Sequence, residues 1–244
     1  MKKNYTEISV VLPAYNEKDN IKIAVGEVDK YLRKNFSRYE IIVVDDGSTD
    51  GTKEIIEAMM KKNPHLRTVR HAVNRKCYGA ALRSGFLAAK MKKVFYTDAD
   101  CQFDINDLDR VMPWADKYDM VIGFRENRQD PVMRIIIARV YNLLIRLAFG
   151  LKVRDVDCSF KLYDREIFKQ ITMTSETGLI DAEVLTKALR KRFTLKEVGV
   201  RHFPRVRGAT IYETGTRNKF WAFIRPEVIT DLLKEIAKLK SEME

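Results

Sequence analysis

Short apolar runs alternate with longer stretches of helical periodicity through the first half of the chain. The runs are rich in β-branched residues, and each ends abruptly at proline or a polar turn, which is typical of strands buried on both faces. Strands are therefore expected at residues 8–13, 41–44, 66–69 and 94–96. This alternation predicts an α/β fold with a doubly wound, mostly parallel sheet and helices on both faces.

The intervening stretches predict the helices. The first runs to about Lys34 with Asn16 as N-cap, the second runs to Met60 with Ser48 or Thr49 as cap, and the third covers residues 78–91. Gly79 and Gly85 are expected to let this third helix pack closely on the sheet.

Polar clusters follow three of the expected strands: residues 13–15, the pair Asp45-Asp46, and residues 98–100. Ligands of wound sheets bind beyond the carboxyl ends of the strands, near a topological switch point. Any one cluster fits an ordinary turn. One architectural rule places all three at the same edge, so together they predict a ligand site.

The third cluster has the spacing of a metal site. Alternate residues of an extended segment point to one side, so Asp98, Asp100 and Gln102 are expected to converge. Two adjacent carboxylates repel each other unless a cation or a proton lies between them. Oxygen ligands suit Mg²⁺ or Mn²⁺, and Mg²⁺ is commonly shared with substrate phosphates. A lone Asp-x-Asp is more simply a solvated turn, and the upstream clusters favour the metal.

Charge narrows the class of partner. The net charge is +11 among 244 residues, so the partners are expected to be anionic: nucleotide phosphates, an acidic membrane surface or nucleic acid.

The three cysteines are widely spaced and fit neither a zinc site nor a disulfide framework, which indicates a reducing compartment. No signal peptide and no apolar run of ~18 residues is found, so we expect a cytoplasmic location.

Residues 10–17, 42–52 and 98–102, in this order and spacing, resemble family 2 glycosyltransferases of the GT-A (nucleotide-diphospho-sugar transferase) fold, over roughly residues 7 to 215. The resemblance implies roles for individual residues. The base and ribose of a nucleotide sugar would contact Pro13, Tyr15, Glu17 and Asp46, the donor site would include Ala99, and Asp98, Asp100 and Gln102 would hold the divalent ion.

Arginines dominate the next part of the chain. A fifth strand, residues 119–125, is expected to deliver Arg125 to the ligand edge, where a phosphate contact is favoured over simple solvation. Residues 131–149 read as a helix with arginines set among apolar residues. Such a helix can lie in a bilayer interface with its guanidinium groups snorkelling, or pack against the domain or a second subunit. Both interpretations stay open.

Residues 131–149, 153–163 and 203–210 are similar to the polyprenyl-phosphate subgroup of this family, which includes dolichyl-phosphate mannose synthase. The similarity implies that Arg134 and Arg205 hold phosphates. Two positions depart from the subgroup: Ala138 replaces a serine, and Ile211 stands where lysine is common.

Two kinds of acceptor remain open at this stage. A hydroxyl acceptor needs a general base, for which Asp181 is the candidate, and Glu183 should point elsewhere. A lipid phosphate is already ionised near pH 7 and needs positive charge instead. Asp155 and Asp157 either orient nearby arginines or cap turns.

We therefore expect a catalytic domain over residues 1–215 and an amphipathic helical tail, without a transmembrane domain, over residues 216–244. The tail can contact the membrane peripherally, dock on the domain or pair with another chain. The predicted function is metal-dependent, inverting transfer of a sugar from a nucleotide-diphosphate sugar to a polyprenyl phosphate. A saccharide or protein hydroxyl acceptor is the alternative. A non-catalytic basic binding module ranks lowest, and nucleic acid is not expected, because the acidic strand ends would repel a polyanion.

Overall fold

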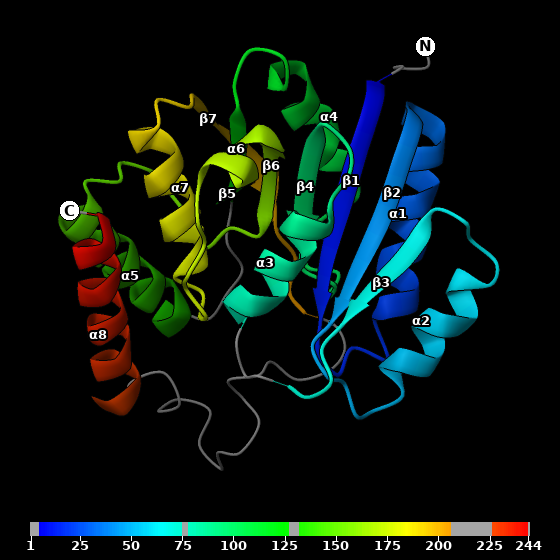
Figure 1. The fold of residues 1–244 in the computed structure, drawn as a ribbon, viewed down its shortest axis with the longest axis horizontal. Helices are drawn as coiled ribbons and strands as arrows, with labels where there is room; N and C mark the ends of the chain where they lie inside the picture. The colour runs from blue at the N-terminus through cyan, green and yellow to red at the C-terminus, as the bar shows by residue number, and fades with distance from the viewer. Residues whose placement is uncertain (1–4, 75–77, 127–131, 206–225, 244) are drawn as a thin grey trace.

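The computed structural model describes residues 5–74, 78–126, 132–205 and 226–243. A sheet crosses the middle of the molecule with helices on both of its faces (Figure 1). The strands, in chain order, are β1 (Tyr5–Ala14), β2 (Phe36–Asp45), β3 (Leu66–Arg70), β4 (Lys93–Thr97), β5 (Met120–Glu126), β6 (Phe160–Asp164) and β7 (Leu195–Arg201). The helices are α1 (Ile21–Asn35), α2 (Thr52–Met60), α3 (Tyr78–Ala88), α4 (Leu108–Val111), α5 (Val132–Phe149), α6 (Glu166–Gln170), α7 (Ile180–Arg190) and α8 (Pro226–Met243), with short 3₁₀ turns η1 (Ile105–Asp107) and η2 (Met112–Trp114).

The order of strands in the sheet is β3-β2-β1-β4-β6-β5-β7. The pairs β1–β2, β2–β3, β1–β4 and β5–β7 are parallel, and β6 is antiparallel to both of its neighbours. Six of the described strands therefore share one direction, which confirms the predicted mostly parallel α/β fold. Their carboxyl ends, and the beginning of β6, meet at the lower edge of the sheet in Figure 1. We call this edge the rim.

The predicted helix caps were wrong. The first helix begins at Ile21, and Asn16 instead has a positive φ of 55° and accepts a hydrogen bond from Thr49 N at 2.9 Å. Ser48 Oγ accepts from Asn16 N at 3.0 Å, and α2 begins only at Thr52. The polar side chains that were expected to cap helices therefore connect the loop after β1 to the loop after β2.

Helix α3 packs unusually close to the sheet. A Cβ added at Gly85 would lie 2.3 Å from Val11 Cγ1, so glycine is required there, as predicted. Gly79 differs from the prediction, because it lies against the backbone of residues 175–177 and not against the sheet; a Cβ there would be 2.5 Å from Ser175 O. Glycine thus brings the beginning of α3 against the segment that precedes α7.

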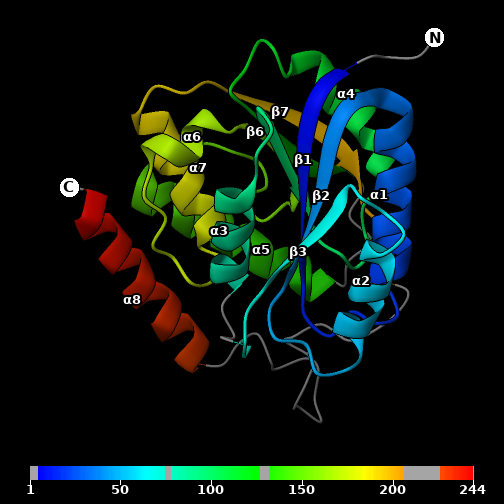
Figure 2. The same ribbon diagram turned by 45° about the vertical axis from the view of Figure 1, so that its right-hand side comes forward.

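The C-terminal helix α8 lies along the left side of the molecule in both views (Figures 1 and 2), next to α5. Its Ile236 and Leu239 are buried in the core on this face of the sheet. Glu235 accepts a hydrogen bond from Thr177 Oγ1 at 2.5 Å. The described part of the tail therefore docks on the rest of the fold. The expected boundary at residues 215 and 216 lies outside the described residues.

Helix α5 keeps an outward apolar face. The side chains of Ile136, Val140, Leu143 and Leu147 are 46%, 52%, 53% and 74% exposed, and their spacing places them on one stripe of the helix. We call these four residues the α5 stripe. In the part of the chain that the structure describes, no helix combines the length and apolar character needed to cross a membrane.

Candidate active site

The rim brings together the loops that follow β1, β2, β4 and β7. The polar clusters predicted from the sequence do share one edge, because the strands that carry them are parallel neighbours in the order β2-β1-β4. The loop after β7 reaches them through a bridge between Phe103 and His202, and Phe203 N donates to Gln102 O at 2.8 Å. This connection carries Arg205 to the acidic cluster.

Asp98 follows the last residue of β4 directly and accepts two hydroxyl hydrogen bonds. Tyr78 donates to its Oδ1 at 2.8 Å, and Ser159 donates to its Oδ2 at 2.6 Å. Sequence reasoning did not find either donor. Tyr78 opens α3 and Ser159 precedes β6, and neither has a charged or motif-like signature.

Asp100 is buried beside Asp98. Burial, followed by the charge of Asp98, raises the pKa of Asp100 to about 7. The chain turns here and is not extended, because β4 ends at Thr97 and Cys101 has a φ of 60°. The predicted extended alternation was therefore wrong, although the two carboxylates still converge.

Gln102 is tied to the loop after β7. Its backbone N donates to Asp100 Oδ1 at 3.1 Å, and its side-chain Nε2 donates to Phe203 O at 3.0 Å. The amide nitrogen therefore holds the loop that carries Arg205. A role for Gln102 as a metal ligand stays a prediction.

Arg205 lies between two carboxylates. Its Nη2 contacts Glu17 Oε1 at 2.6 Å, and its Nη1 is 3.6 Å from Asp100 Oδ2. The other Glu17 oxygen accepts from Asn20 at 2.7 Å. Both partners of the Arg205–Glu17 pair are partly buried, with side chains 13% and 11% exposed. A cation thus already lies against the acidic cluster.

This arrangement fits a divalent ion that is shared with a substrate. No group of three or more His, Cys, Asp and Glu side chains among the described residues is arranged to hold a metal alone. Asp98 and Asp100 supply two carboxylates, which is the usual protein share of a Mg²⁺ site completed by phosphates. Burial and the charge of Asp98 raise the pKa of Asp100, and the nearby guanidinium of Arg205 partly offsets that shift.

Asp46 belongs to a second polar chain at the rim. Its Oδ1 is 2.5 Å from His71 Nδ1, and His71 Nε2 is 2.9 Å from Ser84 Oγ. His71 follows β3 and was not singled out from the sequence; its strand-end position was the available signal. Of the other predicted donor-site residues, Pro13 is buried within β1, Tyr15 is half-buried and Ala99 is buried beside Asp98.

Arg125 is engaged by Asp155. Its Nε and Nη2 each donate to this carboxylate at 2.7 Å, and its backbone N donates at 3.2 Å. Burial lowers the pKa of Arg125, but the hydrogen-bonded carboxylate raises it above its ordinary value. Asp155 therefore fixes the guanidinium plane near the rim. Arg134 lies in α5, and its side chain is outside the described residues.

Asp181 lies in the interior beneath the rim. Lys161 Nζ contacts its Oδ1 at 2.7 Å, Tyr96 OH donates to the same oxygen, and Lys161 also donates to Tyr96 OH at 2.8 Å. Burial raises the pKa of Asp181, and the Lys161 charge opposes that shift. We call Tyr96, Lys161 and Asp181 the interior cluster. An aspartate engaged in this way is poorly placed to take a proton from an acceptor, so the geometry does not support a general base here.

Glu183 points away from the interior cluster, as expected. It accepts from Thr174 N and Ser175 N, both at 2.8 Å.

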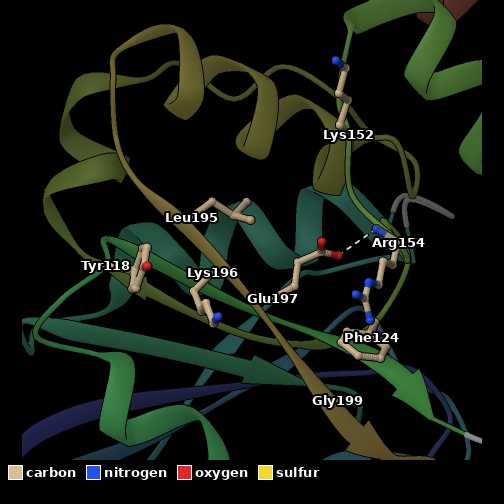
Figure 3. Close-up of a pocket in the computed structure, with 8 residues that line it drawn as sticks. All are labelled: Tyr118, Phe124, Lys152, Arg154, Leu195, Lys196, Glu197 and Gly199. Carbon is tan, nitrogen blue, oxygen red and sulfur yellow. Dashed lines mark hydrogen bonds between the residues drawn. The ribbon is translucent and has the colours of Figure 1, made fainter.

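A concavity of about 670 Å³ lies along the edge strand β7 (Figure 3). Arg154 stacks over Phe124 with its guanidinium carbon 4.5 Å from the ring centroid, and its backbone N donates to Glu197 at 2.7 Å. None of the predicted site residues lines this concavity. The concavity is therefore not the ligand site that the sequence predicts. The residues that line the concavity are Tyr118, Phe124, Lys152, Arg154, Leu195, Lys196, Glu197 and Gly199.

Two curated relatives match most of this chain. An undecaprenyl-phosphate 4-deoxy-4-formamido-L-arabinose transferase of Pectobacterium atrosepticum is 31% identical over 209 residues, which cover 84% of this chain and 62% of the relative. A dolichyl-phosphate beta-glucosyltransferase of Saccharomyces cerevisiae is 29% identical over 220 residues, covering 79% of this chain and 66% of the relative. The chain thus spans less than two thirds of each of these relatives.

The fold is shared with glucosyl-3-phosphoglycerate synthase of Mycobacterium tuberculosis, solved with Mn²⁺, UDP and glucosyl-3-phosphoglycerate. The TM-score is 0.68 at 20% identity, over 95% of this chain and 80% of the other. The family model described as Glycosyl transferase family 2 matches residues 9–172. With its mostly parallel wound sheet and this match over most of its length, the chain belongs to glycosyl transferase family 2.

Proposed function

We propose that this protein transfers a sugar from a nucleotide-diphosphate sugar to a polyprenyl phosphate. The observation that carries the proposal is the convergence of Asp98, Asp100 and Arg205 at the rim, where anionic and cationic groups face the same space. The names of the relatives, which specify undecaprenyl phosphate and dolichyl phosphate, support this class of acceptor.

The donor end of the site is assigned to the loops after β1, β2 and β4. Tyr15, Glu17 and Asp46 would contact the nucleoside, and Asp98 and Asp100 would hold Mg²⁺ or Mn²⁺ against the diphosphate. When bound, the ion neutralises the charge that grows on the leaving diphosphate. Arg205 would exchange Glu17 and Asp100 for phosphate oxygens, to which a guanidinium binds bidentately.

The acceptor end needs positive charge and no base. A phosphomonoester has a second pKa of about 6 and is ionised at neutral pH. Arg125, oriented by Asp155, together with Arg134 and Arg205, would hold it in line with the anomeric carbon, and direct displacement inverts that carbon. The interior position of Asp181 weighs against the hydroxyl-acceptor alternative.

The α5 stripe is assigned to an anionic membrane surface, where a polyprenyl phosphate resides. Arg139 and Arg146 are exposed on the same helix, so apolar and cationic side chains are presented together. This combination favours an interfacial helix with snorkelling guanidinium groups.

A transfer assay tests the reaction. The purified chain is incubated with Mn²⁺ or Mg²⁺ and a panel of nucleotide sugars, with and without polyprenyl phosphate. We expect metal-dependent transfer that requires the lipid, and a loss of at least about 100-fold for Asp98→Asn and Asp100→Asn. The exposed Asp116→Asn is the matched control. Full activity of both rim variants would contradict the proposal.

Vesicle flotation tests the membrane surface separately. Leu143→Asn with Leu147→Asn should release the protein from phosphatidylglycerol vesicles. Leu87→Asn, at a leucine of α3 that is 63% exposed, should not. Equal binding by all variants would remove the α5 stripe from the proposal without affecting the assignment of the rim.

A further inference from the structure

We infer that Tyr78 and Ser159 are positioning residues for Asp98, which fix its carboxylate in the orientation that the divalent ion requires. The inference rests on the proposed function, because it takes Asp98 as a metal ligand. It adds two residues that lie outside the acidic motif of residues 98–102. Tyr78 precedes that motif in the chain, and Ser159 follows it.

The two hydroxyl groups clamp Asp98 from different elements. Tyr78 reaches Oδ1 at 2.8 Å from the beginning of α3, and Ser159 reaches Oδ2 at 2.6 Å from the residue before β6. Both oxygens are therefore engaged at once, which fixes the carboxylate plane. Each oxygen has two lone pairs, so one hydroxyl donor leaves a lone pair for a cation.

Tyr78 is held as a donor and held in place. A tyrosine phenol carries its proton at neutral pH and can therefore donate to Asp98. Next to it, Gly79 N donates to Glu176 O at 2.8 Å, and the lack of a Cβ on Gly79 permits this close contact.

Ser159 is held by the interior cluster. Lys161 Nζ donates to Cys158 O at 2.6 Å while it pairs with Asp181 at 2.7 Å. Lys161 is fully buried, and Ser159 is 6% exposed. The buried lysine thus fixes the peptide next to the serine that orients Asp98. Lys161 and Asp181 therefore support the position of Ser159 and do not themselves contact Asp98.

Groups that orient a metal ligand typically contribute 10- to 100-fold to metal affinity. Without them the Asp98 carboxylate can rotate, and beside Asp100 it would turn away from the like charge. Loss of one hydroxyl should therefore lower the affinity for the ion more than it lowers the stability of the fold.

The test measures Mn²⁺ affinity by electron paramagnetic resonance in the presence of UDP, together with kcat and KM for the donor. We expect about 10-fold weaker Mn²⁺ binding for Tyr78→Phe and for Ser159→Ala, with a larger loss in the double variant. Excess Mn²⁺ should restore much of kcat in each single variant. Tyr163→Phe is the control, because this buried hydroxyl has no hydrogen-bond partner among the described residues.

The pair Ser159→Thr and Ser159→Val separates the hydroxyl from the packing, because the two side chains have nearly the same shape. Threonine should retain Mn²⁺ affinity, and valine should lose it. Affinities within twofold of the parent for Tyr78→Phe and Ser159→Val, while Asp98→Asn abolishes binding, would overturn the inference and leave the proposed function standing. Unchanged Mn²⁺ binding by Asp98→Asn itself would overturn both.

Discussion

The rim and the interior cluster each pair aspartates with a cation, and they do so in opposite ways. At the rim, Arg205 lies 3.6 Å from Asp100 on a loop beyond the sheet. In the interior, Lys161 lies 2.7 Å from Asp181, and both side chains are almost completely buried. Under the proposed function, an ion and a phosphate would replace the contacts of the rim pair, whereas the interior pair is enclosed and would keep its contacts. Asp100, whose cation is 3.6 Å away, is the kind of carboxylate that could bind a ligand, whereas Asp181, whose cation is 2.7 Å away, supports the site.

The sharpest way to break this comparison is to remove the interior cation. Lys161→Met leaves Asp181 buried without its charged partner, and removal of one member of a buried ion pair costs about 3–5 kcal/mol. Urea denaturation should show this loss of unfolding free energy. The double variant Lys161→Met with Asp181→Leu should recover most of it. A Lys161→Met protein as stable as the parent would show that the interior pair is not fixed as described.

The stability lost when the Lys161–Asp181 pair is broken also affects how the activity of Asp181→Asn is interpreted. Activity lost in that variant would come with lost stability, because Lys161 would be left without its charged partner. The variant therefore reports on a general base only when its folded fraction is measured alongside.

The second largest effect is expected in the pH dependence of stability, to which Asp100 at the rim should contribute. The folded pKa of Asp100 is about 7, against an ordinary value of 3.8, because the carboxyl is buried beside Asp98. Between about pH 4 and 7 the folded protein therefore holds a proton that the unfolded chain has released, and stability falls as pH rises. The slope is about 1.4 kcal/mol per pH unit for one such group.

Asp157 has a folded pKa of about 7 as well, from burial and the charges of Asp181 and Asp155, and adds to this slope. Asp100→Asn should therefore remove the contribution of Asp100 to the slope and leave the contribution of Asp157. Denaturation of the parent and of Asp100→Asn across pH 4.5–7.5 measures the difference, and parallel curves would contradict the assigned burial of Asp100.

A smaller effect is expected at Tyr96, whose hydroxyl contacts both Lys161 and Asp181. Hydrogen bonds to charged groups contribute about 1.5–3 kcal/mol, so Tyr96→Phe should destabilise by about that amount. Tyr163→Phe, which removes a buried hydroxyl without a partner among the described residues, should be close to neutral. Equal losses in both variants would mean that packing, and not the interior cluster, determines the result.

The smallest effect on stability is expected at Arg205. Glu17 keeps its contact with Asn20 when the guanidinium is removed, and the Asp100 carboxyl, with a pKa of about 7, can take up a proton in place of the lost cation. Arg205→Ala should therefore cost about 1.5 kcal/mol of unfolding free energy, the lower end for a hydrogen bond to a charged group. UDP affinity should nevertheless fall measurably by calorimetry. A large loss of stability with unchanged UDP affinity would mean that Arg205 stabilises the fold, as Lys161 does, and does not bind the nucleotide.

The rim could be predicted from the sequence because its signal is local: Asp46, Asp98 and Asp100 each follow an apolar run, and parallel strands place such residues together. The interior cluster could not. Tyr96 and Asp181 are 85 residues apart, and Lys161 joins them only because β6 is antiparallel to β4. Local rules also failed at Asn16 and Ser48, which favour helix caps in isolation but pair with each other across 32 residues.

That exchange of contacts between the loops after β1 and β2 has a consequence for recognition. With Asn16, Ser48 and Thr49 joined by hydrogen bonds at 3.0 and 2.9 Å, the two loops form one connected wall of the rim. Under the proposed function, this connection would reduce the conformational entropy lost when the nucleoside binds, so that more of the affinity of its contacts would be retained. It also means that substitutions in the two loops should not add independently, even where neither residue touches the ligand.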